Sequence, residues 1–420
     1  MTGRNSLWVW ALAVTSLMQV TSAFLTSAMT VIGPTLTEAA GVAPERIGHL
    51  TAISSFGSML FLMTGVPFLV RWGPVRLLQL GALAGALALL VALTGWWPTM
   101  MLASFLVGIG YGPSPPAGSD ILQRHAPRGR RSLVFSIKQA AAPLGGAVAG
   151  LVVPPLAILY GWRIGLVMAA LLAASTTLLV QPWRQVLDEN RDPTRPMNFR
   201  AVLSPTTLMM PFRVLARVPI LPRLTYLAFS FAAVQGCLLG FYVTYLVDAL
   251  GEPLETAGLA FAVLQGTGVV ARVCVGWIAD RVGSGILILT VLAAGSIATP
   301  LVTAAMSSAW PFWAILAIAV ASGFAATSWN GIYMAEVARM APEGRIGDAT
   351  SGSTFLTFIG YVLGPFVFAT VVEQTASYRI AFLLAAALPL SAVLLLRAPS
   401  TRRRSERPVM GKPELGREER

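Results

Sequence analysis

The sequence predicts an all-α membrane protein with 12 transmembrane helices in two pseudo-symmetric six-helix bundles. The chain has 420 residues, of which 55% are hydrophobic and 11% charged, whereas a soluble domain carries about 25% charged residues. Its apolar residues gather in twelve runs, each close to the ~20 residues that a helix needs to cross ~30 Å of hydrocarbon. Its arginines concentrate in alternate gaps between those runs, which is typical of cytoplasmic loops.

The twelve apolar runs follow one another with short gaps. We place them near 7–31, 47–70, 77–96, 99–123, 133–155, 161–181, 224–247, 256–279, 285–306, 309–335, 349–372 and 378–397. The first run resembles a signal peptide in its position, but it is too long for one and further runs follow. We therefore interpret it as the first transmembrane helix.

The distribution of charge predicts the orientation of the chain. The gaps after the even-numbered runs are basic, with Arg71, Arg76, Arg124, Arg128, Arg130, Arg131, Arg281, Arg339 and Arg345. The opposite gaps are mainly acidic, with Glu38, Glu45, Asp248, Glu252 and Glu255 beside a lone Arg46. This bias places both termini in the cytoplasm, as expected for a protein of the bacterial inner membrane. It also accounts for the net charge of +12 without a nucleic-acid partner.

One long internal gap divides the chain. We expect an N-terminal six-helix bundle over 1–181, a cytoplasmic linker over 182–223 with a part lying on the membrane surface, a C-terminal six-helix bundle over 224–399, and a disordered cytoplasmic tail over 400–420. The halves repeat weakly. Arg124-His-Ala-Pro127-Arg-Gly129-Arg130 matches Arg339-Met-Ala-Pro342-Glu-Gly344-Arg345 in order and spacing, which indicates a duplication.

The turn after the eighth run carries the most specific pattern, Gly276-Trp-Ile-Ala-Asp280-Arg281-Val-Gly283. Together with the twelve runs, the repeat and the long middle loop, it resembles the major facilitator superfamily of secondary transporters over essentially the whole chain. The resemblance implies two bundles around a central cavity that opens alternately to each side. It also implies gating roles for Gly276, Asp280, Arg281, Gly283, Arg71 and Gly73. Two places depart from the family pattern: Val70 stands where an Asp is usual, and Ser104 where an Arg is usual.

The dipole of the eighth helix disfavours a carboxylate such as Asp280 at its C-terminal end. We therefore expect Asp280 to have partners, namely Arg281 and a helix N-terminus of the other bundle, in a contact that closes the cytoplasmic side. The alternative is a solvated loop pair worth about 0–1 kcal/mol.

Two cations lie inside apolar runs, Lys138 in the fifth and Arg272 in the eighth, and no acidic residue lies in the middle of any run. A charge at such a depth costs ~2.5–3.5 kcal/mol on insertion scales. If both face one cavity, a carboxylate-like substrate would supply the missing charge. The alternative is that both side chains extend to the cytoplasmic surface. The arginine also resembles the arrangement in monocarboxylate and oxalate/formate-type carriers, which often have an acid where this chain has Gly268.

Neutral residues complete the predicted substrate site: Gln19, Gln139, Tyr242, Trp329 and Asn330. Each of them could instead serve helix packing, although an Asn in the middle of a span needs a hydrogen-bond partner.

These observations predict a secondary active transporter that moves a small organic anion by alternating access. The alternative is an efflux pump of the same superfamily for drug-like or amphipathic compounds. Pro143-Leu-Gly145-Gly146 and Gly360-Tyr-Val-Leu-Gly364-Pro365 resemble in part the glycine–proline signature of its drug/proton antiporters. The sequence holds no metal-ligand cluster, nucleophile elbow or phosphate loop, so we expect neither an enzyme nor a cofactor or metal. The driving force would then be a gradient of a proton, another ion or a substrate, and we expect a monomer in the lipid bilayer.

Overall fold

The computed structural model describes residues 7–127, 131–194, 205–342 and 345–397, and every regular element in these segments is helical. Eleven helical segments within them are long and apolar enough to cross a membrane. The remaining predicted span, 99–123, is present as two shorter helices, α6 (Trp97–Tyr111) and α7 (Ser114–His125). The predicted fold class, an all-α membrane protein, is therefore confirmed.

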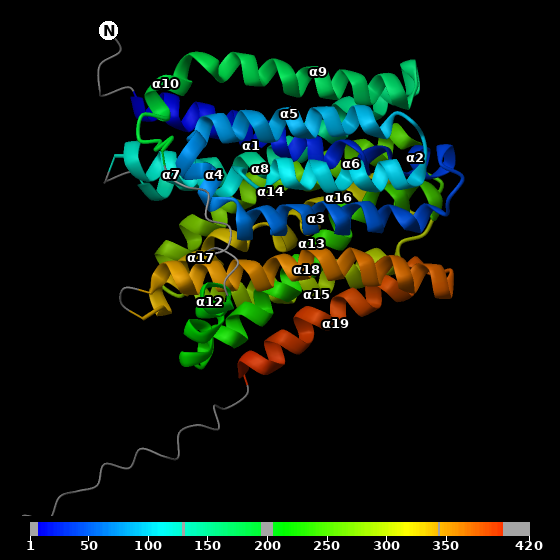
Figure 1. The fold of residues 1–420 in the computed structure, drawn as a ribbon. Helices are drawn as coiled ribbons and strands as arrows, with labels where there is room; N and C mark the ends of the chain where they lie inside the picture. Colours follow the sequence, from blue (N-terminus) through cyan, green and yellow to red (C-terminus); the bar gives the residue numbers. More distant parts are fainter. Residues whose placement is uncertain (1–6, 128–130, 195–204, 343–344, 398–420) are drawn as a thin grey trace, which may run out of the picture.

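The spans of the first half begin and end close to the predicted positions. They are α1 (Leu7–Ala28), α3 (Ile47–Thr64) continued by α4 (Val66–Trp72), α5 (Pro74–Ala92), α6 with α7, α8 (Arg131–Tyr160) and α9 (Trp162–Val180). The short helix α2 (Gly33–Ala39) follows α1. In Figure 1 these helices lie side by side in the upper part of the molecule.

The spans of the second half follow the same order. They are α13 (Ile220–Asp248), α14 (Leu254–Val282), α15 (Gly285–Ala305), α16 (Phe312–Thr327) with α17 (Asn330–Met340), α18 (Ile346–Thr375) and α19 (Tyr378–Arg397). The predicted linker contains α10 (Arg184–Leu187) and α12 (Pro205–Arg217), and α13 begins inside its predicted range. Part of the linker and the whole of the predicted tail, 400–420, lie outside the described residues.

The fourth and tenth spans are both interrupted, and each interruption precedes one of the two matched arginine-containing loops. Between α6 and α7, Pro113 has no backbone N–H to continue the helical ladder. Between α16 and α17, the hydroxyls of Thr327 and Ser328 donate to the carbonyls of Gly323 and Phe324, each at 2.6 Å. Such bonds compete with the backbone ladder and bend helices. The two halves thus share a structural irregularity as well as a sequence repeat.

We call the end of the molecule with the arginine-rich loops the basic end and the other the acidic end. Figure 1 shows α4, α7, α10, α12 and α17 gathered at the basic end. The two halves meet near the acidic end through α3 with α18 and through α8 with α14. There a Cβ on Gly48 would lie 2.7 Å from the carbonyl oxygen of Pro365. Arg46 Nη2 also lies 3.6 Å from Glu373 Oε1. The halves are therefore in contact at the acidic end.

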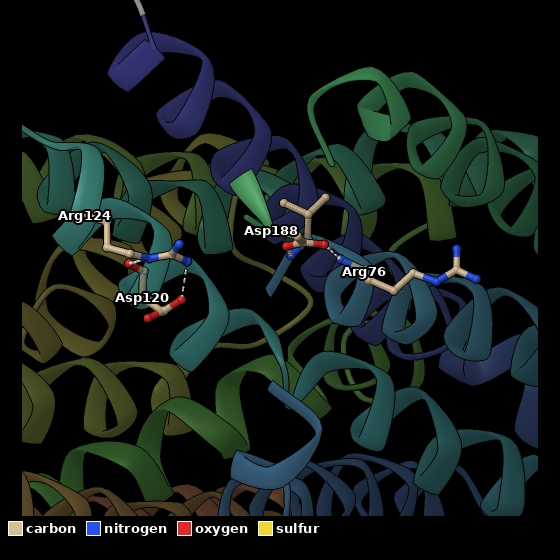
Figure 2. Close-up of polar contacts among 5 residues, drawn as sticks. Arg76, Asp120, Arg124 and Asp188 are labelled. Atoms are coloured by element: carbon tan, nitrogen blue, oxygen red, sulfur yellow. Dashed lines mark hydrogen bonds and ion pairs between the residues drawn. The ribbon is translucent and has the colours of Figure 1, made fainter. Parts of the chain in front are cut away.

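A buried carboxylate organises the first half at the basic end. Asp188 follows α10, is 3% exposed, and accepts hydrogen bonds from the backbone N–H groups of Val75 (2.7 Å) and Arg76 (3.0 Å). Figure 2 shows this carboxylate at the start of α5, apart from the Asp120–Arg124 ion pair on α7. A carboxylate at a helix N-terminus satisfies unpaired donors and interacts favourably with the helix dipole. Asp188 therefore ties the linker to the first bundle.

Candidate functional site

A cavity of about 370 Å³ lies between the two halves, within the range typical of small-molecule sites. Residues of α1, α3, α6 and α8 line it on one side, and residues of α13, α14, α17 and α18 on the other. Arg272 is the one charged side chain among the described residues that line it. The cavity therefore presents a cation without a lining carboxylate to neutralise it.

Two backbone carbonyls hold the guanidinium of Arg272. Its Nε donates to the carbonyl of Thr327 at 2.9 Å, and one of its Nη atoms donates to the carbonyl of Gln139. Thr327 is the last residue of α16, so its carbonyl has no partner within the helix. The carbonyl of Gln139 would normally accept from the N–H four residues later, but Pro143 stands there and has none. Arg272 thus satisfies two carbonyls that the helices leave unpaired, one in each half.

The same guanidinium retains donors for a ligand. Of its five N–H groups, the two bonds to Thr327 and Gln139 use two. The hydroxyls of Tyr111 and Tyr361, which also line the cavity, lie close enough to interact electrostatically with it. An arginine fork with free donors at a cavity wall suits a planar carboxylate, which it can bind through two parallel hydrogen bonds.

Glutamine side chains hold the aromatic residues of the cavity wall in place. Gln235 Oε1 accepts from Trp329 Nε1 at 3.1 Å and from the hydroxyl of Tyr361 at 2.8 Å. Gln19 Nε2 donates to the hydroxyl of Tyr111 at 3.1 Å. Two further polar groups of the wall, Gln265 Oε1 and Thr51 Oγ1, have no hydrogen-bond partner among the described residues. The wall therefore combines fixed aromatic faces with polar groups that a ligand could satisfy.

The structure brings four of the predicted substrate-binding residues to the cavity wall: Arg272, Gln139, Trp329 and Asn330. Gln19 lies behind the wall and supports Tyr111. Tyr242 packs inside the second half, where its hydroxyl donates to the carbonyl of Ile315 at 3.4 Å.

Lys138 lies away from the cavity lining, between α8 and α7. It is 2% exposed, and its Nζ donates to the carbonyl of Ser114 at 3.3 Å. A Cβ on Gly118 would lie 2.6 Å from Lys138 Cε, so the absence of a side chain there leaves room for the lysine. Successive residues of a helix point about 100° apart, so Gln139 lines the cavity whereas Lys138 does not. The two predicted cations therefore do not share one wall.

Sequence reasoning did not select Tyr111, Gln235, Gln265 or Tyr361 for the site. A signal was available for the two glutamines, because each is an amide within an apolar span and needs a partner there. Tyr361 lies in the stretch of α18 from Gly360 to Pro365, whose glycines and proline suggested an efflux pump.

The predicted gating residues lie at the basic end. Gly283 adopts a positive φ of 68° and ends α14, with its N–H bonded to the carbonyl of Ala279 at 2.9 Å. Arg281 stacks on Trp277, 3.9 Å from the ring centre. Asp280 is exposed, and no described residue forms a hydrogen bond or ion pair with it. Among the described residues, the expected contact between Asp280 and the other bundle is therefore not seen in this conformation.

The corresponding turn of the first half is closed by a different acid. Gly73 directly precedes α5 and has a φ of 89°, and a Cβ there would lie 2.5 Å from the Asp188 carboxyl carbon. Arg71 is half-buried in the last turn of α4. Asp188 therefore supplies a carboxylate in the loop where Val70 does not.

Comparisons with known proteins agree on one family. The family model described as Major Facilitator Superfamily matches residues 15–351. A hexuronate transporter of Bacillus subtilis (strain 168) is 22% identical over 404 residues, which are 92% of each chain. A 4-hydroxybenzoate transporter of Pseudomonas aeruginosa is 26% identical over 280 residues, covering 61% of this chain and 62% of that one.

Solved structures show the same fold. A mutant form of the nucleoside transporter NupG superposes with a TM-score of 0.75 at 15% identity, over 92% of this chain and 98% of that one. The human organic anion transporter MFSD10 superposes with a TM-score of 0.68 at 17% identity, over 93% and 99% of the two chains.

Proposed function

Because the chain belongs to the major facilitator superfamily, we propose that it is a secondary active transporter that moves a small organic anion across the bacterial inner membrane by alternating access. The observation that carries this proposal is Arg272, a cation on the wall of a cavity whose described lining contains no carboxylate. An anionic ligand would neutralise the charge of Arg272 and accept hydrogen bonds from its remaining N–H donors.

The chemistry of the cavity favours a carboxylate. Arg272 is held by backbone carbonyls that carry only partial charges, so its positive charge is not neutralised. The aromatic residues Tyr111, Trp329 and Tyr361 are among those that line the cavity. The named substrates of two relatives, a hexuronate and 4-hydroxybenzoate, are both carboxylates with hydroxyl groups. Such a compound would pair its carboxylate with Arg272 and its hydroxyl with the unpartnered Gln265 or Thr51.

The conformation fits one step of alternating access. The halves touch at the acidic end, and Asp280, the predicted gating residue, is exposed at the basic end with no partner among the described residues. The positive charge of its loops favours a cytoplasmic basic end, and the contact of the halves at the acidic end supports the proposal that this conformation is the one open to the cytoplasm. Closure would bring Asp280 and Arg281 of α14 against the first bundle.

A ligand screen tests the proposal. The purified full-length protein is heated in the presence of a panel of mono- and dicarboxylates and a matching panel of lipophilic cations. A ligand that binds the folded state raises the apparent stability with its concentration. We expect a carboxylate to raise the melting temperature of the wild type, and we expect Arg272→Gln to lose that shift. A lost charged hydrogen bond costs ~1.5–3 kcal/mol, so the affinity should fall roughly 10- to 150-fold.

Arg379→Gln is the matched control, because Arg379 is exposed at the start of α19, far along the chain from the cavity lining. Uptake of the identified carboxylate into proteoliposomes should be lost in Arg272→Gln and kept in Arg379→Gln. Stabilisation by lipophilic cations or neutral drugs alone would overturn the anion proposal in favour of efflux of drug-like compounds.

A further inference from the structure

A second cavity, of about 400 Å³, lies at the basic end outside the central one. It is open to the surface and is bordered by α12, α13 and α18. Its walls are mostly apolar and include Phe212, Leu215, Phe229, Leu356 and Ile359. It reaches the surface at Ala216 and Pro222, which are exposed. Such a cavity suits a hydrocarbon chain rather than a hydrated anion.

The helix that covers this cavity has the character of a membrane-surface helix. On α12, Val214 and Leu215 are buried, whereas Arg213 and Arg217 are exposed. The helix contains no acidic residue, and neither arginine forms an ion pair with a described residue. A basic amphipathic helix lies in the plane of the membrane interface, where arginines attract anionic headgroups.

The arginines and the cavity mouth lie together. Arg213 precedes Ala216 by three residues, so the two are neighbours on the helix surface, and Arg217 follows Ala216 directly. We propose that this cavity binds an acyl chain of an anionic phospholipid, with the headgroup held at Arg213 and Arg217. The charge of the rim selects the headgroup, and the apolar walls accept the chain.

A lipid at this place would act on the central cavity through shared walls. Thr225 lines the lateral cavity and accepts a hydrogen bond at 3.3 Å from the hydroxyl of Tyr333, which lines the central cavity. On α18, Leu356 and Ile359 face the lateral cavity while Thr357 and Phe358 line the central one. The bound chain would therefore stabilise α18 and α17 and, through them, one wall of the substrate cavity.

Native mass spectrometry of the delipidated full-length protein tests the site without any substrate, so its outcome is independent of the proposed transport function. The protein is titrated with phosphatidylglycerol and, separately, with phosphatidylcholine of the same chains. We expect one tightly retained phosphatidylglycerol. At about 1 kcal/mol for each basic residue, the double variant Arg213→Gln/Arg217→Gln should retain it roughly 30-fold more weakly. Ala216→Trp should block the mouth and reduce the retention of both lipids.

The control variants are Arg397→Gln, an exposed arginine at the end of α19, and Ala387→Trp, on the exposed face of the same helix. Both should retain phosphatidylglycerol like the wild type. Hydrogen exchange reports the coupling: added phosphatidylglycerol should slow exchange in α17 and α18 of the wild type but not of Ala216→Trp. Equal retention of the two lipids by all variants would mean adventitious annular lipid and would overturn the proposal.

Discussion

The guanidinium of Arg272 donates a hydrogen bond to the carbonyl of Gln139, a carbonyl that Pro143 deprives of its partner in the same helix. A residue of the second half is thereby fixed by a proline of the first. The position of the cation depends on this irregularity of α8 as much as on α14.

Pro143→Ala should therefore weaken the binding of the carboxylate found in the ligand screen. The variant regains a backbone N–H at this position, which would donate to the carbonyl of Gln139 and displace Arg272 from it. A hydrogen bond contributes about 0.5–1.5 kcal/mol, so we expect a roughly two- to tenfold loss of affinity in the thermal-shift titration. Pro155→Ala in the same helix is the control and should bind normally. Equal affinity in all three proteins would contradict this role of Pro143.

Replacing Gly48 should shift the molecule away from the present conformation. A Cβ there would lie 2.3 Å from the ring of Phe241 and 2.7 Å from the carbonyl oxygen of Pro365, so Gly48→Ala forces the halves apart at the acidic end. The distance between spin labels at Glu45→Cys and Gln374→Cys should increase. Gly266→Ala, where a Cβ meets no atom within 4 Å, should leave that distance unchanged. An unchanged distance in Gly48→Ala would contradict this prediction, because it would show that the neighbouring residues adjust around the new Cβ without separating the halves.

Asp280→Asn should slow transport without unfolding the protein. Asp280 has no partner among the described residues in the present conformation, so its charge should matter only when the basic end closes. We expect the spin-label distance at the acidic end to stay that of the present conformation when substrate is added, whereas the wild type redistributes. Wild-type transport rates in Asp280→Asn would mean that the residue is a solvated loop acid.

Asp188→Ala should destabilise the first bundle. The variant loses both hydrogen bonds to the start of α5, and a lost helix cap costs about 0.5–2 kcal/mol. Thermal unfolding in detergent measures the change. Glu189→Ala removes the same charge from the next, exposed residue and should leave the stability unchanged. Equal melting temperatures for the two variants would exclude a capping role.

The contribution of Asp188 should also depend on pH. Burial raises the pKa of Asp188 above its ordinary value of 3.8, and this effect outweighs the opposing hydrogen bonds from Val75 and Arg76 and the charges of Arg184 and Arg191. The folded state then binds the proton more tightly than the unfolded state. The stabilisation that Asp188 contributes is therefore complete at pH values below the pKa of the unfolded state. It decreases as the pH rises through the pKa of the folded state.

Melting curves of the wild type and of Asp188→Asn at several pH values check the sign. The difference in stability, wild type minus variant, should decrease as the pH rises above the ordinary aspartate value and then become constant. A difference that grows with pH would mean that the hydrogen bonds prevail over burial.

Much of the fold could be predicted, because twelve apolar runs and alternating arginines are direct consequences of the bilayer. Pro113 marks the interruption of the fourth span in the sequence. The interruption of the tenth span depends on the hydroxyls of Thr327 and Ser328, and these two residues do not stand out within a strongly apolar run. The buried role of Asp188 could not be predicted, since it belongs to a polar segment whose partner, the start of α5, lies far away in sequence.

The site was harder to predict than the fold. Lys138 and Gln139 are neighbours in sequence and both polar, and only the packing of α7 and α14 around α8 decides which of them reaches the cavity. Tyr111 comes from the first half and approaches Arg272 only after the halves assemble, whereas Tyr361 lies in the same half as Arg272 but about 90 residues along the chain. Residue type therefore identified Arg272, but not its surroundings.

The crossing of α8 and α14 has a mechanical consequence. A Cβ on Gly150 would lie 2.7 Å from the carbonyl oxygen of Gly258, and a Cβ on Gly258 would lie 2.7 Å from that of Gly150. The two helices thus meet backbone to backbone, and the side chains of Pro154 and Phe261 pack beside this contact. Because neither glycine has a side chain, the two backbones could stay in contact here while the halves turn relative to each other. Arg272, farther along α14, also joins the halves through its hydrogen bond to the carbonyl of Gln139. The halves would then turn only when this bond breaks.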